Sequence, residues 1–199
     1  MRLYRAPWST NVQRVTMALA HKGLHDYDET VISYDDRSPV EAVSGQPLVP
    51  VIEFDDGAVV ADSMAIVAAL EERFPDPPLF PVDPAGRAHV ELFCDWFNRV
   101  WKLAPNTIEA GGDVAALSAE MDAHLDLFER MLTGRDWFFY GAIGAADLCA
   151  YPFLKYAASR DPADDEPFHR ILDEHQSVTG RPHLAAWIER VSASQQRGL

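Results

Sequence analysis

The chain has 199 residues, 48% of them hydrophobic, which is enough to bury a core in one large domain or two small ones. Its 31 acidic and 17 basic residues give a formal charge of -14, so a nucleic-acid phosphate backbone would repel it. No basic start followed by an apolar stretch marks a secretion signal, and no apolar run reaches the roughly 18 residues that span a bilayer. We therefore expect a cytoplasmic protein with no direct nucleic-acid partner and no membrane partner.

The first 80 residues alternate short apolar runs with helical patterns, which is typical of an α/β unit. The first helix carries a T-x-x-Q capping box from Thr10 to Gln13, and Gly23 stops it. In chain order, the pattern predicts a strand at Leu3–Tyr4, a helix over Thr10–Lys22, a strand over Tyr27–Ile32, a loop over Asp35–Pro47 with room for one short helix, a hairpin of Val49–Phe54 and Ala58–Val60, and a helix over Ser63–Phe74.

Five prolines fall between Pro75 and Pro84, a density that regular secondary structure does not tolerate. We place a domain boundary there, which predicts an α/β domain over residues 1–78 and an all-helical domain over residues 84–199. Apolar residues at helical spacing mark three core-facing stripes in the second domain. The stripes are Val90, Phe93, Cys94, Phe97, Trp101 and Ala104; Leu117, Met121, Leu125, Phe128 and Leu132; and Leu184, Trp187, Ile188 and Val191.

The composition of two further segments in the second domain predicts whether they are buried or exposed. Ala145–Tyr156 is apolar almost all round, which predicts a helix buried at the centre of the domain. The acidic loop Asp161–Glu166 is expected to be solvated. Cys94 and Cys149 have no C-x-x-C spacing and lie among apolar residues, so we expect small buried side chains rather than a disulfide or a metal site.

His169, Asp173 and His175 have a near-helical spacing that a metal ion could use. No further ligand of clear spacing accompanies them, so the pattern favours a solvated helix face. The sequence also has no glycine-rich phosphate-binding loop. We expect neither a metal nor a nucleotide.

Several motifs in the right order carry a family resemblance. The segments W-S-T-N-V-Q-R-V at residues 8–15 and A-L-A-H-K-G at residues 18–23 resemble the first loop and helix of the glutathione-transferase superfamily. V-P-V at residues 49–51, D-S-M-A-I at 62–66 and A-D-L-C-A-Y-P-F-L at 146–154 are similar to later motifs of that family. The resemblance covers nearly the whole chain and implies a thioredoxin-like N-terminal domain followed by a helical C-terminal domain.

The resemblance also implies roles for single residues. In the serine-type zeta and theta classes, a serine at the position of Ser9 faces the glutathione sulfur, so Ser9 is the implied catalytic residue. The residue before a cis proline, here Val49, meets the glutathione backbone, while Asp62 and Ser63 would hold its γ-glutamyl end. The implied glutathione-binding residues are Thr10, Asn11, Leu48, Val49, Pro50, Asp62 and Ser63.

The sequence allows two roles for Ser9, activation of a thiol or capping of the helix. A free cysteine thiol titrates near pH 8.5, so activation at neutral pH requires a pKa lower by about one to two units, or about 1.4 kcal/mol each. A charge-assisted hydrogen bond of about 1.5 to 3 kcal/mol, with about 0.3 to 1 kcal/mol from a helix N-terminus, is sufficient. The alternative is that Ser9 or Thr10 only caps the helix, and Thr10 fits that role better because of its capping-box partner.

Three aromatic residues are candidates for an apolar cleft that would hold a hydrophobic electrophile. They are Trp8, Phe97 and Trp101. Aromatic residues on a helical stripe also form cores, which is the alternative interpretation for Phe97 and Trp101. Trp8 lies in a predicted loop and is therefore the strongest of the three.

Two functions compete. The leading hypothesis is an enzyme that uses glutathione as cosubstrate and activates its thiol for attack on an electrophilic small molecule, by conjugation or isomerisation. The alternative is a non-catalytic binding protein, because residues Glu71–Leu79 resemble stringent starvation protein A, which keeps the fold and binds RNA polymerase. Fold alone does not separate the two. The resemblance also implies a homodimer.

Overall fold

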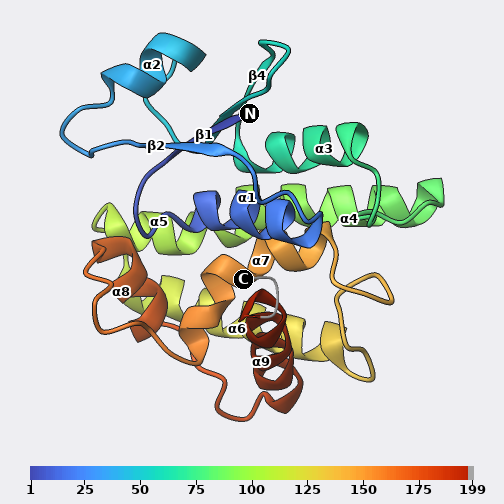
Figure 1. Ribbon diagram of the computed structural model, residues 1–199. Helices are drawn as coiled ribbons and strands as arrows, with labels where there is room; N and C mark the ends of the chain where they lie inside the picture. Colours follow the sequence, from blue (N-terminus) through green and yellow to red (C-terminus); the bar gives the residue numbers. More distant parts are fainter. Residues whose placement is uncertain (197–199) are drawn as a thin grey trace. The chain divides into compact units, whose positions relative to one another are not determined.

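The computed structural model describes residues 1–196 (Figure 1). The chain forms two compact units. The first unit is Met1–Leu79 and the second begins at Phe80, so the division falls inside the proline-rich segment of residues 75–84. The predicted helical domain extends to residue 199, and its last three residues lie outside the described part of the chain.

The N-terminal unit is a four-stranded mixed sheet with three helices, in the strand order β2-β1-β3-β4. Strand β1 pairs with β2 in parallel and with β3 antiparallel, and β3 pairs antiparallel with β4. The predicted β-α-β, loop, β-β-α order is confirmed, and the predicted loop contains one short helix. The elements are β1 (Arg2–Arg5), α1 (Thr10–His21), β2 (Asp28–Val31), α2 (Ser38–Ser44), β3 (Val51–Glu53), β4 (Val59–Ala61) and α3 (Ser63–Arg73).

Alternating side chains of this sheet face two helical layers. Tyr4 and Val51 are cross-strand partners and pack on Val40 of α2. The neighbouring pair, Leu3 and Ile52, points to the opposite face because side chains alternate along a strand. There α1 and α3 lie side by side (Figure 1). A slip of one residue would exchange the two buried faces, so the packing fixes the register of the sheet.

A buried ion pair joins the C-terminal ends of α1 and α3. Lys22 Nζ lies 2.7 Å from Glu71 Oε2. The same ammonium donates to the carbonyl oxygens of Phe74 at 2.6 Å and Pro77 at 3.1 Å. Glu71 Oε2 in turn accepts from the Leu79 N–H at 3.0 Å. The segment that resembles stringent starvation protein A therefore contains a residue that ties the end of the N-terminal unit to its core.

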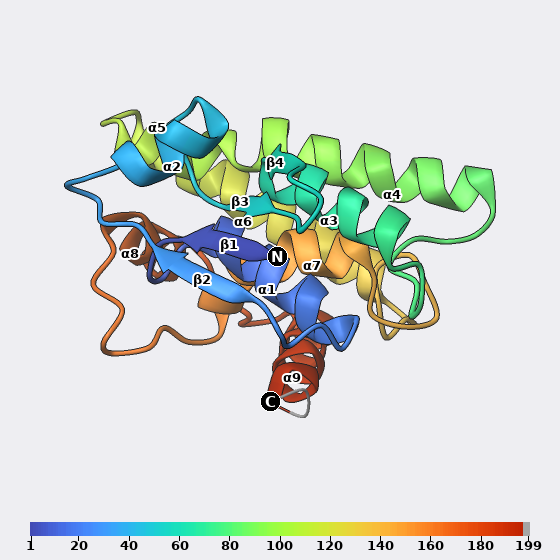
Figure 2. The same cartoon turned by 45° about the horizontal axis from the view of Figure 1, so that its top comes forward.

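The second unit is helical throughout its regular structure. Figure 2 shows α7 among the other helices of this unit, and α4, η2 and α9 contact it directly. Its elements are α4 (Pro84–Trp96), the π-helical turn η1 (Phe97–Trp101), α5 (Leu103–Glu109), α6 (Val114–Leu132), α7 (Ala145–Leu154), the 3-10 turn η2 (Lys155–Ala157), α8 (Pro167–Glu174) and α9 (Pro182–Gln196).

Helix α7 is buried on all sides, as the sequence predicts, although it ends at Leu154 and continues as the turn η2. Cys149 on this helix is fully buried, and Cys94 on α4 is buried with its Sγ 3.8 Å from the Ala145 carbonyl oxygen. Neither cysteine forms a disulfide and both are buried, so the prediction of small buried side chains is confirmed.

Asp147 fixes the start of α7 from a position only 1% exposed. Its Oδ1 accepts from the Trp187 Nε1–H at 2.7 Å and from the Phe138 N–H at 3.2 Å. Its Oδ2 accepts from the N–H of Gly144, the N-cap residue, at 3.0 Å. Burial raises the pKa of Asp147 to about 6, and the three hydrogen bonds act against that rise. Since Gly144 has no side chain, Asp147 alone supplies the side-chain oxygens of this helix start.

Candidate functional site

Three chain segments meet at one end of the N-terminal sheet. The register pairs Tyr4 with Val51, and Val51 with Ala61, so the end of β1, the start of β3 and the end of β4 lie together. The segment after β1 contains Ser9, and the segment after β4 begins with Asp62. The fold thus brings the first helix start, the loop before β3 and the third helix start to one edge.

Ser9 is the N-cap of α1 and is partly exposed. Its Oγ accepts a hydrogen bond from the Val12 N–H at 3.3 Å, and its carbonyl oxygen accepts from the Gln13 N–H at 2.9 Å. The hydroxyl oxygen is therefore an acceptor toward the helix, which leaves its proton for donation elsewhere. Capping and donation to a ligand are compatible roles for this serine.

Thr10 is the first residue inside α1 and is 5% exposed. The predicted capping box from Thr10 to Gln13 is therefore wrong, because the cap lies one residue earlier, at Ser9. An N-cap residue has extended backbone angles, and Ser9 has them with φ -62° and ψ 115°. The T-x-x-Q spacing is present, but Thr10 already has helical backbone angles and cannot be the N-cap residue.

Strained backbone occurs next to both helix starts. Among residues 1–196, the non-glycine residues with positive φ are Trp8, at 60°, and Asp62, at 76°. Trp8 immediately precedes Ser9, and Asp62 immediately precedes Ser63. Such conformations cost about 1 to 3 kcal/mol each and cluster at functional sites. The strain thus marks the edge of the sheet where the candidate residues lie.

Asp62 is the N-cap of α3. Its Oδ1 accepts from the N–H groups of Met64 at 2.9 Å and Ala65 at 3.1 Å, and the residue is exposed. No described residue donates to Oδ2, so a ligand cation can reach that oxygen. Ser63 follows as the first helical residue and is only 3% exposed.

Arg14 is a residue that the sequence motifs contain but to which sequence reasoning gave no role. It is 1% exposed, although it is charged, and its Nη1 donates to Asn11 Oδ1 and to Ser63 Oγ, each at 3.2 Å. It therefore joins the first turn of α1 to the first turn of α3. A signal was present: Arg14 lies four residues from both Thr10 and Ala18, on a helix whose wide face is buried.

The loop before β3 contains a cis peptide bond between Val49 and Pro50. Pro50 is buried, and Val49 packs its side chain on the core cluster formed by Tyr4 and Val51. Leu48 is 62% exposed. The cis bond that the resemblance implies is therefore present, and the apolar side chain of Leu48 is exposed beside it.

The structure separates the three aromatic candidates. Phe97 and Trp101 have no exposed surface and stack on each other at 4.4 Å, in contact with Phe128 and Phe153 of the same unit. They form the core of the helical unit, so their prediction as cleft-lining residues is corrected. Trp8 is 42% exposed and alone of the three presents its ring to solvent.

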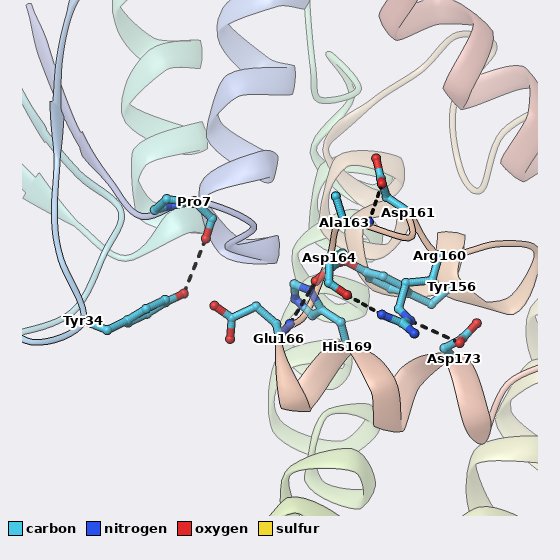
Figure 3. Close-up of polar contacts among 10 residues, drawn as sticks. All are labelled: Pro7, Tyr34, Tyr156, Arg160, Asp161, Ala163, Asp164, Glu166, His169 and Asp173. Carbon is cyan, nitrogen blue, oxygen red and sulfur yellow. Dashed lines mark hydrogen bonds and ion pairs between the residues drawn. The ribbon is translucent and has the colours of Figure 1, made fainter.

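A buried polar cluster replaces the solvated face predicted around His169 (Figure 3). Asp164 is 1% exposed and accepts from the Tyr156 hydroxyl at 2.8 Å, and its Oδ2 lies 2.8 Å from His169 Nδ1. Burial opposes ionisation of Asp164, yet the bonds from His169 and Tyr156 hold its pKa below the ordinary value. Arg160 binds the Asp164 carbonyl oxygen and pairs with Asp173 at 3.2 Å.

The polar residues that suggested a metal ion are thus engaged separately. His169 binds Asp164, Asp173 binds Arg160, and His175 Nδ1 lies 2.9 Å from Ser118 Oγ. Within residues 1–196, no group of three or more histidine, cysteine, aspartate or glutamate side chains is arranged to hold a metal ion. In the same range no helix is both long enough and apolar enough to cross a membrane.

An open hollow of about 260 Å³ lies elsewhere in the N-terminal unit. Arg2, Asp28, Glu53 and Asp55 line it, at the opposite end of β1 from Ser9. The Met1 ammonium pairs with Asp55 Oδ1 at 2.5 Å and Arg2 pairs with Asp28 at 3.3 Å, so two of the three carboxylates that line it already have a partner within the protein. The two helix starts at the other end of the sheet, with their exposed or partly exposed caps Ser9 and Asp62, are therefore the better candidates for chemistry.

Two family models match this chain. Residues 3–78 match the glutathione S-transferase N-terminal domain, and residues 111–190 match the glutathione S-transferase C-terminal domain. The first match includes all three segments at the edge of the sheet. The second includes the buried helix α7 and the cluster around Asp164.

Curated proteins and solved structures resemble the chain over most of its length. A maleylacetoacetate isomerase of Pseudomonas aeruginosa is 31% identical over 176 residues, covering 80% of this chain and 82% of the relative. The glutathione S-transferase GstB of Escherichia coli K12 is 26% identical, with 92% and 89% covered. A Methylobacterium radiotolerans glutathione S-transferase, solved in complex with glutathione sulfonate, superposes with a TM-score of 0.71 at 27% identity, with 96% and 90% covered.

Proposed function

We propose that this chain, which belongs to the glutathione S-transferase family, is an enzyme that binds glutathione at the sheet edge of its N-terminal unit and activates the thiol with Ser9. The observation that carries the proposal is the Ser9 hydroxyl, which accepts from the Val12 N–H and keeps its own proton for donation. The named relatives are transferases and an isomerase, which favours the enzyme over the alternative binding protein.

The proposed chemistry begins with ionisation of the glutathione thiol. A thiolate beside the first turn of α1 would accept a hydrogen bond from Ser9 and lie at the positive end of the helix dipole. Together these terms supply about 2 to 4 kcal/mol, against about 1.4 to 3 kcal/mol needed to bring the thiol pKa to neutrality. The thiolate then attacks an electrophilic small molecule, for which the exposed ring of Trp8 is a candidate contact.

The rest of the tripeptide would bind to the other two segments at this edge of the sheet, the start of α3 and the loop before β3. In this proposal Asp62 Oδ2 takes the γ-glutamyl ammonium, and Ser63 binds the carboxylate of the same group. The backbone at Val49, before the cis bond, pairs with the extended peptide, beside the exposed Leu48. Thr10 and Asn11, at the first turn of α1, stay candidates for contacts near the sulfur.

The similarity to a maleylacetoacetate isomerase makes cis-trans isomerisation of an unsaturated diketo acid the first reaction to test. The thiolate would add to the conjugated double bond, and the π electron pair would move to the carbonyl oxygen. Rotation about the resulting single bond and loss of the thiolate would give the trans isomer. Glutathione is regenerated, so the reaction needs no oxidant or reductant.

A thermal-shift panel of glutathione, glutathione sulfonate and other low-molecular-weight thiols tests the proposal. Ligand at ten times its dissociation constant adds about 1.4 kcal/mol of folded-state stability, which raises the melting temperature measurably. Isomerisation and conjugation assays with the stabilising thiol then identify the reaction. If no thiol changed the melting temperature, the enzyme proposal would be contradicted and the alternative of a non-catalytic binding protein would be favoured.

We also propose a homodimer, because two-fold assemblies dominate soluble oligomers. Leu92, Val100 and Leu103 are 67%, 40% and 60% exposed on α4, η1 and α5, which gives the helical unit apolar surface to bury. Light scattering is expected to give about twice the chain mass of 22.2 kDa. A particle of one chain mass at micromolar concentration would exclude the dimer.

A cytoplasmic location and the absence of a nucleic-acid partner are part of the same proposal. Cys94 and Cys149 are buried and not joined in a disulfide, which suits a reducing compartment. The formal charge of -14 opposes binding to phosphate backbones. Cell fractionation and a filter-binding assay with duplex DNA would test these two statements.

A further inference from the structure

The most unusual charge in the N-terminal unit is Arg14, a guanidinium with 1% exposure between two helix starts. Long charged side chains are almost never fully buried unless the fold gives them partners. The Nη1 of Arg14 donates to Asn11 Oδ1 and to Ser63 Oγ, each at 3.2 Å. Both acceptors belong to the segments in which we propose that glutathione binds.

The contact with Arg14 determines what Ser63 can do. Arginine has only donors, so Ser63 Oγ must accept in this bond, and its own proton is left for another partner. No described residue takes that proton. The cap at Asp62 already occupies the N–H groups of Met64 and Ala65. The hydroxyl of Ser63 is therefore available as a donor at the start of α3, close to a buried positive charge.

We propose that Arg14 is a positioning and specificity-determining residue of the γ-glutamyl site. It holds Ser63 Oγ as an acceptor, so the Ser63 hydroxyl is directed to a ligand carboxylate, and the site prefers an anionic group there through this hydroxyl. Its second bond to Asn11 ties this selection to the helix start that carries Ser9. The inference rests on the proposed function, because it assigns the chemistry of one end of the same ligand.

Binding of two ligands to the purified protein tests this role by calorimetry. One ligand is glutathione sulfonate, and the other is its analogue with the γ-glutamyl α-carboxylate converted to the primary amide. The wild type is expected to prefer the carboxylate ligand by tenfold or more, since a hydrogen bond to a charged group is about twice as strong as a neutral one. Arg14→Met should bind the carboxylate ligand about tenfold more weakly and the amide ligand almost unchanged. The ratio of the two affinities should therefore approach 1.

A double-mutant cycle separates positioning from simple support of the fold. If Arg14 acts through Ser63, Ser63→Ala lowers the same preference, and the double variant loses no more than Ser63→Ala alone. Arg14→Lys keeps the buried charge but loses the forked geometry, so it should retain part of the preference even if Arg14→Met fails to fold. Arg73→Met, at the other end of α3 and paired with Asp56, is the matched control and should leave the preference unchanged.

The outcomes are distinct. A wild type that binds neither ligand overturns the proposed function. A wild type that binds both, combined with an Arg14 variant that is less stable but keeps the wild-type preference, overturns only this inference. Additive losses in the double variant would overturn it as well, because Arg14 would then act independently of Ser63.

Discussion

Helix starts in the two units use polar side chains in opposite ways. In the N-terminal unit, Asp62 caps α3 through one oxygen while exposed, and Ser9 caps α1 through a single bond of 3.3 Å. In the helical unit, Asp147 is 1% exposed and uses both oxygens to satisfy three N–H groups around the start of α7. The first two keep hydrogen-bonding capacity that a ligand could reach, whereas the third is closed off from solvent.

The difference separates function from stability. A cap with an unused donor or acceptor can bind a ligand at small cost to the fold. A buried carboxylate that satisfies three donors supports the fold, because each donor left without its acceptor costs about 1 to 3 kcal/mol. Substitutions at the two kinds of helix start should therefore move different measurements.

Asp147→Ala is expected to have the largest effect. It leaves the N–H groups of Trp187, Phe138 and Gly144 without an acceptor inside the helical core, so unfolding by urea should show a loss of about 3 to 5 kcal/mol. Glutathione affinity of the remaining folded protein should stay within twofold. A loss below about 1 kcal/mol would show that water replaces the carboxylate, and the contrast between the helix starts would fail.

Ser9→Ala should act mainly on the reaction. Loss of the thiolate donor should lower the rate about ten- to a hundredfold and move the bound thiol's pKa, read from the pH-rate profile, back toward its solution value. Because Ser9 is also the cap, stability should fall by about 0.5 to 1 kcal/mol.

Ser9→Gly is the matched control for that experiment. Glycine at an N-cap costs only a few tenths of a kcal/mol of stability. Ser9→Gly should therefore show the same decrease in rate as Ser9→Ala, with a smaller decrease in the free energy of unfolding. Thr10→Val, one residue inside the helix, should keep the pH profile. If both Ser9 variants retained the wild-type rate, the serine would be a cap alone, and Thr10 or Asn11 would become the candidate donor.

The pH dependence of stability sharpens the description of Asp147. Its pKa is raised to about 6 in the folded state, from an ordinary 3.8, so the unfolded chain ionises first as the pH rises. The unfolded state then binds fewer protons, and this group's contribution to stability is present below pH 4 and is lost as the pH rises through 6. Relative to Asp147→Asn, the wild type should lose about 1 to 2 kcal/mol between pH 5 and 7.5.

Paired urea titrations of the two proteins at several pH values measure this difference. The shared contributions of all other carboxyl groups cancel in the subtraction. A difference that grows in favour of the wild type with rising pH would mean that the three hydrogen bonds outweigh burial, and the pKa of Asp147 would be lowered instead.

Asp62→Asn should have the smallest effect on the fold and a specific effect on binding. Asparagine caps helices as well as aspartate does, so the free energy of unfolding should change by a few tenths of a kcal/mol at most. The loss of charge opposite the γ-glutamyl ammonium should weaken glutathione binding about tenfold by calorimetry. Equal affinity in both proteins would remove Asp62 from the binding site and leave it as a cap only.

The motifs predicted the architecture because local patterns and chain order are sufficient for it. The Asp-Gly turn, the helical stripes and the proline-rich boundary lie in the sequence itself, and the observed elements follow them within a few residues. The family motifs also pointed to the segments that meet at the sheet edge. Those segments are adjacent because the pairing of β1, β3 and β4 is set by the same alternation that predicts the strands.

Burial of polar groups could not be predicted in this way. Asp164 stands in an acidic loop, and His169 has neighbours that suggest solvent, yet both are buried against Tyr156 because α8 and η2 pack on each other. The N-cap of α1 is Ser9 and not the predicted Thr10, because the extended backbone that defines a cap occurs at Ser9, next to the positive φ of Trp8.

The sequence by itself determined the order of elements and the family, and it predicted the domain boundary region and the segments of the candidate site. Only the tertiary structure decided that Arg14 bonds to Ser63 and that Phe97 and Trp101 belong to the core. It also decided that Asp147 accepts the hydrogen bonds around the start of α7. The physical reason is that spacing along the chain records which residues share a face. The partners and the solvent that a polar side chain meets depend on elements far away in the sequence.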